Sequence, residues 1–82
     1  MDFKDWLQEK KNLKGRSAQD VESRLKRVIK ILCIKKVTKN TLKNLENDED
    51  FLALTVSVRS QLRRSVRLYL EYELENSSII KE

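Results

Sequence analysis

Ser57–Glu75, SVRSQLRRSVRLYLEYELE, is the stretch on which the rest of the chain depends. At 3.6 residues per turn, its apolar and cationic side chains separate onto two sides of one helix. The apolar side consists of Val58, Leu62, Val66 and Tyr69, and the cationic side consists of Arg64 and Arg67, flanked by Arg63. One side can therefore pack against a core while the other side contacts a partner.

The composition is that of a small helical protein. The 82-residue chain is 39% hydrophobic and 38% charged, with one glycine and no proline. This length supports a single core of three or four helices, and the hydrophobic content is too high for a wholly disordered chain. We therefore expect an all-α domain at 1–75, followed by a C-terminal tail at 76–82.

Positive charge is concentrated in two blocks. The formal net charge is +5, and residues 1–40 hold twelve Lys or Arg against five acids, whereas residues 56–70 hold four arginines and no acid. Two acidic blocks, 41–55 and 71–82, separate and follow them. Such a balance favours anionic partners, nucleic acid above all.

Several classes of function are disfavoured by residues that the chain lacks or has only once. Cys33 is the only cysteine and there is no histidine, so an intrachain disulfide is excluded and a zinc site would lack its usual ligands. No paired carboxylates suggest acid–base catalysis, and no apolar run approaches the roughly 20 residues of a membrane span. We expect a cytoplasmic protein that is not an enzyme, with no cofactor, no metal and no membrane contact.

The first helix is expected to begin after Asp2 as its N-cap and to run to about Asn12. Phe3, Trp6 and Leu7 lie at helical spacing, which assigns Trp6 to packing rather than to base stacking. Gly15 is expected to end this region as a turn residue that tolerates positive φ.

A second, longer helix is expected to follow directly. Ser17–Asp20 has the spacing of a capping box, which predicts a helix start at Ser17. Its apolar side comprises Val21, Leu25, Val28, Ile29, Leu32 and the stem of Lys36, where we expect the helix to end, with Cys33 on a flank. Lys26, Arg27 and Lys30 form a cationic stripe on the opposite side. Ile31 and Ile34 fall off the apolar side, which indicates neighbours on more than one side.

The remaining elements are shorter except for the last. Thr38 or Asn40 is expected to cap a third helix that contains Leu42 and Leu45, and the acids of 47–50 should begin a further helical turn. Ser57 is then expected to cap the final helix. We expect the non-periodic residues 76–82 to form a frayed tail, in which Ile79 and Ile80 offer an apolar anchor for the domain, a partner or a second copy.

Many of these residues together resemble the N-terminal core-binding, SAM-like domain of tyrosine recombinases and phage integrases. The similarity spans about residues 3–75. It is carried by Phe3, Trp6, Leu7, Glu9 and Lys10, by Gly15, Arg16, Ser17, Ala18, Val21, Leu25, Lys26, Arg27 and Leu32, and by Ser57, Ser60, Gln61, Leu62, Arg63, Arg64, Ser65, Val66, Arg67 and Tyr69.

The resemblance implies a compact four- to five-helix bundle whose second and fourth helices contact duplex DNA. In that family, catalysis belongs to a separate C-terminal domain that supplies arginines, a histidine and a tyrosine. A chain without histidine cannot recombine DNA alone, so we expect either a fragment of a recombinase-like protein or a free-standing module of a phage or mobile element. The expected DNA-binding residues are Lys14, Arg16, Ser17, Lys26, Arg27, Lys30, Arg59, Ser60, Arg63, Arg64 and Arg67.

Two other interpretations of the cationic residues stay open. Charged helix faces are often only solvated, and Ser17 serves a helix start whether or not its neighbouring N–H groups meet phosphate. Alternatively, the chain is a small helical adaptor or inhibitor that binds an acidic protein, or it self-associates through the C-terminal tail. Arginine favours the DNA interpretation because its planar fork suits phosphate and guanine edges.

Overall fold

Five helices make up the part of the chain that the structure describes. The computed structural model describes the backbone of residues 2–81 and the side chains of residues 2–75. The helices are α1 (Phe3–Lys10), α2 (Gly15–Leu32), α3 (Thr41–Glu46), α4 (Glu49–Leu52) and α5 (Val56–Lys81), and no strand occurs within residues 2–81. The expectation of an all-α, four- to five-helix bundle is confirmed.

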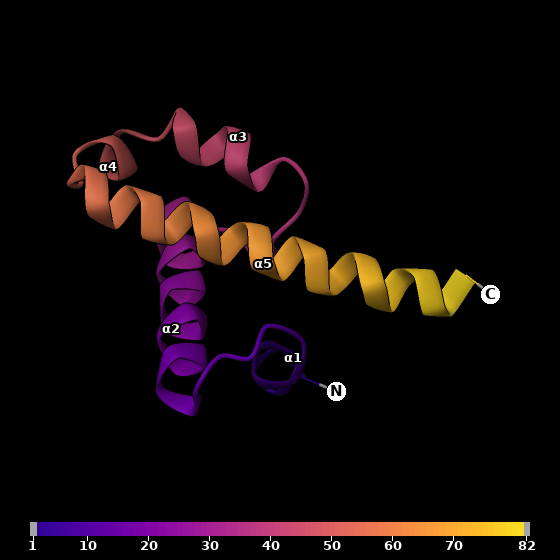
Figure 1. Cartoon of the computed structure of the whole chain (residues 1–82). Coiled ribbons are helices and arrows are strands. Elements are labelled where there is room, and N and C mark those ends of the chain that lie inside the picture. The colour runs from indigo at the N-terminus through magenta and orange to yellow at the C-terminus, as the bar shows by residue number, and fades with distance from the viewer. Residues whose placement is uncertain (1, 82) are drawn as a thin grey trace.

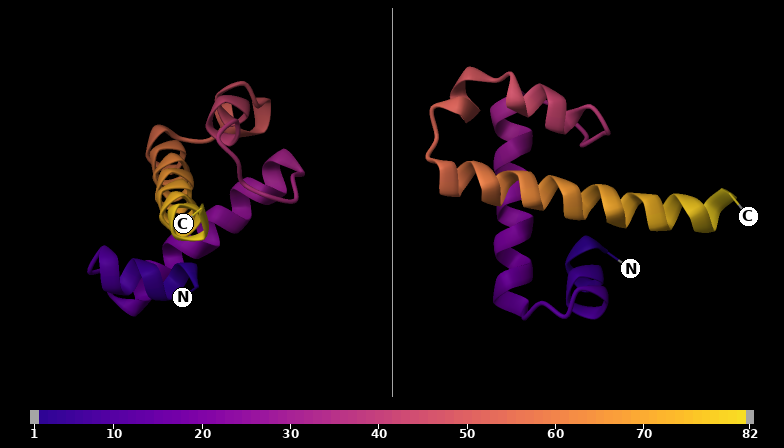
Figure 2. Two further views of the ribbon diagram at one scale, coloured as in Figure 1. Left: turned by 90° about the vertical axis from the view of Figure 1, so that its right-hand side faces the viewer. Right: turned by 45° about the horizontal axis from the view of Figure 1, so that its top comes forward.

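The two long helices, α2 and α5, cross and organise the bundle (Figure 1). α2 packs most extensively against α5 and then against α1. α1 lies beside the N-terminal end of α2, and α3 and α4 lie near its C-terminal end, on the other side of α5 (Figure 2). α2 thus contacts α1, α3 and α5, which confirms the expectation that it has neighbours on more than one side.

The core lies where these helices meet. Leu7, Val28, Leu45, Phe51 and Val66 have no exposed surface, and Leu62 is 1% exposed. Phe51 explains why the four-residue helix α4 forms, since so short a helix is not stable by itself. The Asp48 carboxylate accepts a hydrogen bond from the Phe51 N–H at 3.0 Å, so the predicted acidic helix start is confirmed.

Aromatic side chains join α1 to α5. The Phe3 ring lies 5.1 Å from the Tyr69 ring and 5.4 Å from the Tyr72 ring, measured between centroids. Trp6 is 4% exposed and lies 5.6 Å from Tyr72. The assignment of Phe3, Trp6 and Leu7 to packing is confirmed.

The turn between α1 and α2 differs from expectation. Helix α1 ends at Lys10, and the left-handed residue is Asn12, with φ of 56°, rather than Gly15. The Leu13 N–H donates to the Leu7 carbonyl at 3.2 Å, which reverses the chain at Asn12, a residue type that tolerates this conformation. Gly15 is instead the first residue of α2.

The predicted capping box is therefore wrong. Lys14 is the N-cap of α2 and makes no side-chain capping bond, and Ser17 lies exposed within the first turn of the helix. Asp2 does cap α1, because its carboxylate accepts from the Asp5 N–H at 2.9 Å.

Helix α2 ends four residues earlier than expected. Cys33 takes up the left-handed conformation with φ of 54°, and the Ile34 N–H donates to the Ile29 carbonyl at 3.2 Å. This six-to-one bond is that of a Schellman motif, which stops the helix at Leu32. Cys33 therefore closes the helix instead of lying on its flank, and Lys36 lies beyond it.

The last two predicted caps have different outcomes. Asn40 is the N-cap residue of α3, as one of the two expected, but its side chain makes no capping bond, and the Thr38 hydroxyl accepts from the Asn40 N–H at 3.3 Å. Thr55 serves α5 in place of Ser57, since its hydroxyl accepts from the Val58 N–H at 3.3 Å.

The C-terminal residues continue α5. The helix runs to Lys81, so residues 76–81 are helical instead of forming a non-periodic tail. The predicted docking of Ile79 and Ile80 concerns side chains outside the described ones.

Candidate functional site

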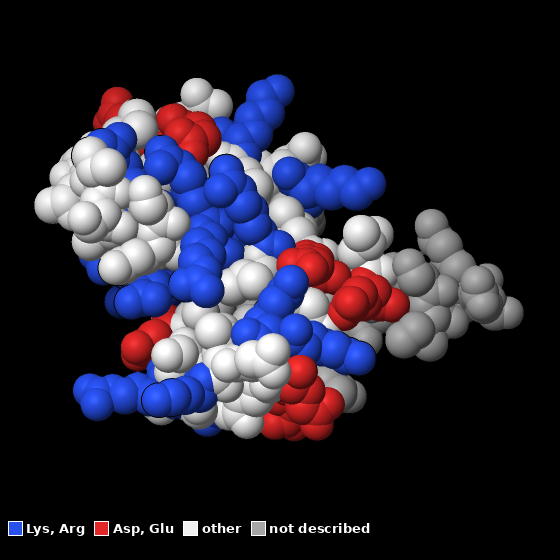
Figure 3. All heavy atoms as spheres, viewed as in Figure 1, with Lys and Arg blue, Asp and Glu red and all other residues white. Residues whose placement is uncertain are grey.

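The first half of α5 carries a basic face, which we define as Arg59, Ser60, Arg63, Arg64 and Arg67. Ser60, Arg64 and Arg67 are exposed, whereas Leu62 and Val66 on the opposite side are buried. Lys and Arg side chains gather over this half of α5, while acidic side chains lie further along the helix (Figure 3). The predicted division of α5 into a packing side and a cationic side is confirmed.

Arg63 is held by an acid from another helix. Its Nε and Nη2 atoms donate to the two carboxylate oxygens of Glu46 in α3, the second at 3.1 Å. Its guanidinium also lies over the Phe51 ring, 5.3 Å from the centroid. Arg63 is therefore positioned by contacts within the chain, with 25% of its side chain exposed.

The ion pair between Arg63 and Glu46 shifts the pKa of both residues. The hydrogen bond from Arg63 lowers the pKa of Glu46, and the charges of Arg59 and Arg67 contribute to this lowering. The pKa of Arg63 is raised in turn by its hydrogen bond to Glu46. Three arginines spaced four residues apart along α5 thus act on one carboxylate.

Arg59 is partly buried at the start of this row. Its Nε atom is buried and makes no hydrogen bond with the described part of the chain. A desolvated guanidinium nitrogen without an acceptor is unfavourable, so the Arg59 side chain has hydrogen-bonding capacity that the fold leaves unused.

The cationic stripe of α2 lies on a different side of the helix pair. Lys26, Arg27 and Lys30 are exposed, while Val21, Leu25 and Val28 on the opposite side of α2 are buried. Since α2 and α5 pack through their apolar sides, each stripe is turned away from the contact that the two helices share. The structure therefore does not bring the two predicted stripes onto one surface.

Lys14, Arg16 and Ser17 form a third group. All three are exposed at the N-terminal end of α2. Lys30 lies about 22 Å further along the same helix at 1.5 Å per residue. The eleven predicted residues thus fall into three groups: the α5 basic face, the α2 stripe and the start of α2.

One cationic set escaped the sequence-based prediction. Lys35, Lys36, Lys39 and Lys43 are all exposed, in the segment that leads from α2 into α3. The sequence does indicate this cationic set, because no acid occurs between Glu22 and Glu46. These lysines follow no helical period, so helical periodicity alone does not identify them as a group.

Tyr69 is a titratable group away from the basic face. Burial and a hydrogen bond to Glu73 raise the pKa of Tyr69 to about 12, so its phenol remains protonated at neutral pH. Within the described residues, no three Cys, Asp or Glu side chains gather as a metal site requires. What the exposed arginines can do is hold anionic groups by charge-assisted hydrogen bonds.

The described helices include none with the length and apolar content needed to cross a membrane.

Comparisons with known proteins found no relative of this chain. No protein-family model, curated protein or solved structure matches the chain.

Proposed function

We propose that this chain is a non-enzymatic DNA-binding module that holds the backbone of duplex DNA through the α5 basic face. The observation that carries the proposal is that Arg64 and Arg67 are exposed within a 15-residue stretch, 56–70, that contains four arginines and no acid. A helix face of this kind fits a DNA groove and the phosphates along it. The resemblance of the sequence to recombinase core-binding domains supports the same conclusion.

The groups of cations have different roles in this proposal. Arg64 and Arg67 make the principal phosphate contacts, and Ser60 adds a neutral hydrogen-bonding group between them and the helix start. Because the α2 stripe faces another side, Lys26, Arg27 and Lys30 reach DNA only where the duplex bends around the bundle. The recombinase resemblance would assign such a module to DNA integration or recombination, and we place it in the cytoplasm.

The experiment compares two matched double variants by fluorescence anisotropy on random duplex DNA between about 50 and 200 mM salt. Arg64→Gln with Arg67→Gln removes two charges from α5, and Lys26→Gln with Lys30→Gln removes two charges from α2. Only the α5 variant should weaken binding strongly, with a log–log salt slope that becomes shallower by about 1.8, or 0.9 per phosphate contact. Equal effects of the two variants, or no binding by the unmodified protein at low salt, would refute the proposal.

A second candidate function is that of an adaptor or inhibitor for an acidic protein. It is favoured by apolar side chains at the surface, since Leu52 is 46%, Val56 68% and Leu74 66% exposed. A partner that remains bound after nuclease treatment, and that is lost on replacing these leucines, would select this function over DNA binding.

A further inference from the structure

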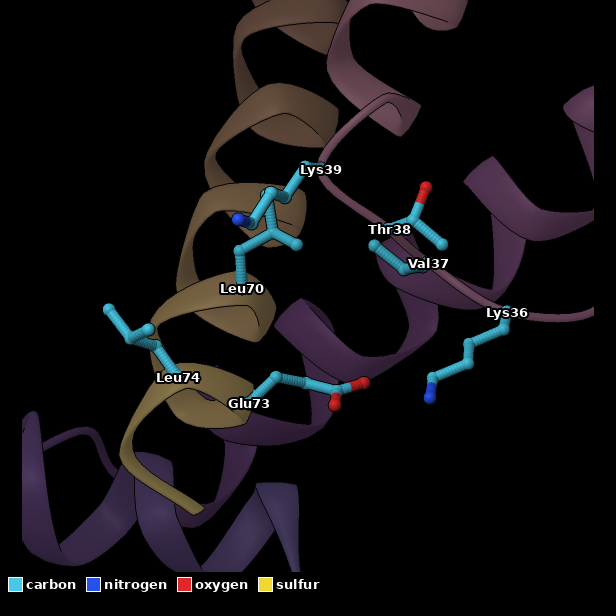
Figure 4. A pocket seen from close by; sticks show the side chains of 7 residues that line it. All are labelled: Lys36, Val37, Thr38, Lys39, Leu70, Glu73 and Leu74. Carbon is cyan, nitrogen blue, oxygen red and sulfur yellow. The ribbon is translucent and has the colours of Figure 1, made fainter. Parts of the chain in front are cut away.

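A groove lies between the C-terminal half of α5 and the segment that follows α2. It has a volume of about 380 Å³ and is lined by Lys36, Val37, Thr38, Lys39, Leu70, Glu73 and Leu74. Leu70, Glu73 and Leu74 come from α5, and Glu73 extends from that helix toward the facing segment (Figure 4). The groove is thus formed by two stretches more than 30 residues apart in sequence.

The groove combines an apolar lining with a cationic rim. Val37, Leu70 and Leu74 supply the apolar surface, and Leu74 is 66% exposed, so no described part of the chain covers it. Lys36 and Lys39 are exposed on one wall, opposite the single acid Glu73. A matching ligand would present an apolar side chain with carboxylates beside it.

The other end of the same molecule presents such a surface. At the junction of α4 and α5, Leu52 and Val56 are 46% and 68% exposed. Glu49 and Asp50, which precede Leu52 by three and two residues in α4, are exposed, and neither makes an ion pair within residues 2–75. We call this surface, which consists of the apolar Leu52 and Val56 and the acidic Glu49 and Asp50, the apolar knob.

We infer that the apolar knob of one copy docks into the α5 groove of a second copy. Leu52 then covers Leu70 and Leu74, while Glu49 and Asp50 lie against Lys36 and Lys39. The acids of the knob are opposite in charge to the two lysines of the groove, which makes the knob a complement of the groove.

The contact is heterologous, because it joins two different surfaces. After one contact, the copy that supplied its knob retains an unused groove and the other copy retains an unused knob, so further copies can add at either end. Val56 and Leu74 are 18 residues apart on α5, so knob and groove are separated by about 27 Å along that helix. The interface is small, and small interfaces of this kind bind weakly, with Kd of about 10 μM to 1 mM.

Sedimentation velocity without DNA tests the inference. The weight-average sedimentation coefficient of the unmodified protein should rise as its concentration is raised to about 1 mM, the upper end of the expected Kd range. Leu52→Glu disables the knob and Leu74→Glu disables the groove, and each variant should sediment as a monomer. Both positions are exposed, so the fold should tolerate them, which circular dichroism verifies, and Gln19→Glu on α2 serves as the control for an added acid.

Mixing the two variants gives the decisive result. Leu52→Glu retains its groove and Leu74→Glu retains its knob, so a mixture should form a one-to-one dimer and nothing larger. A monomeric unmodified protein at all concentrations, normal self-association of either variant alone, or a monomeric mixture would each overturn the inference. None of these outcomes depends on DNA binding.

Discussion

Arg63 in α5 holds Glu46 in α3 through two guanidinium nitrogens while the same guanidinium covers the ring of Phe51. The pair spans 17 residues of sequence and joins two helices beside the proposed DNA-binding face. Glu46 therefore occupies a position at which a phosphate would meet the same three arginines. Within the fold, the carboxylate acts as an internal competitor for the anion that the arginines are proposed to bind.

Replacing Glu46 by Gln should tighten DNA binding. The change removes one negative charge among Arg59, Arg63 and Arg67, so the affinity at low salt should rise a few-fold, as expected for a screened surface charge. Fluorescence anisotropy on random duplex DNA would measure the effect, with Asp20→Asn on α2 as the control. Weaker binding by Glu46→Gln would mean that Glu46 positions Arg63 for DNA instead of competing for it.

Cys33→Gly should stabilise the protein. Cys33 has φ of 54°, a conformation that costs an ordinary residue more than it costs glycine. We expect a gain of about 0.5–1 kcal/mol after the greater chain entropy of glycine is subtracted. Urea unfolding followed by circular dichroism would measure it, and a loss of stability would show that the Cys33 side chain has a structural role.

Gly15→Ala should also stabilise the protein, for the opposite reason. Gly15 is the first residue of α2, and its φ is not positive. A Cβ added there would meet only the Gln8 amide nitrogen, at 3.6 Å, which is an ordinary contact. The expected gain is about 0.4–1 kcal/mol, because alanine has fewer unfolded conformations. The same unfolding assay applies. A destabilised variant would contradict this reasoning and would show that the start of α2 requires the absence of a side chain at Gly15.

Tyr69 should make the protein sensitive to alkali. Its pKa is raised from 10.0 to about 12, so the folded state holds the phenolic proton more tightly than the unfolded state. This contribution to stability is complete below pH 10 and is lost as the pH rises from about 10 to about 12. Tyr69→Phe should lose less stability than the unmodified protein across that interval. Tyrosinate absorbance should lose its highest-pH component in this variant, and an unchanged titration curve would contradict the assignment.

Glu75→Gln should loosen α1. The Trp6 indole N–H donates to the Glu75 carboxylate, so the only tryptophan of the chain reports on the contact between α1 and α5. Weakening a hydrogen bond to a charged acceptor should cost about 1 kcal/mol and change the tryptophan emission. Glu9→Gln, which changes an exposed acid on α1 itself, is the control and should leave the emission unchanged.

The helix faces could be predicted from the sequence because burial follows local periodicity. Val21, Leu25 and Val28 recur at helical spacing, and all three are buried. The helix ends could not be predicted equally well, since Thr55 and Ser57 both carry a hydroxyl able to cap α5. Which of them caps depends on where the chain leaves α4.

In the candidate site, too, local features could be predicted from the sequence and contacts between distant helices could not. That Arg64 and Arg67 are exposed follows from the helical period, and the structure agrees. The pairing of Arg63 with Glu46 and the separation of the α2 stripe from the α5 basic face depend on how distant helices pack, for which no local pattern exists. Whether the predicted residues contact DNA stays a prediction.

The order of charges along α5 runs against its backbone dipole. A helix is normally stabilised by acids in its first turn, yet the first turn of α5 holds no acid and contains Arg59, while Glu71, Glu73 and Glu75 come later. This arrangement costs the isolated helix stability, so α5 depends on the core to remain helical. The N-terminal end of the helix dipole and the arginines are both positive, so the first turns of α5 have a positive electric potential. Packing against the core, rather than helix propensity, keeps these turns helical.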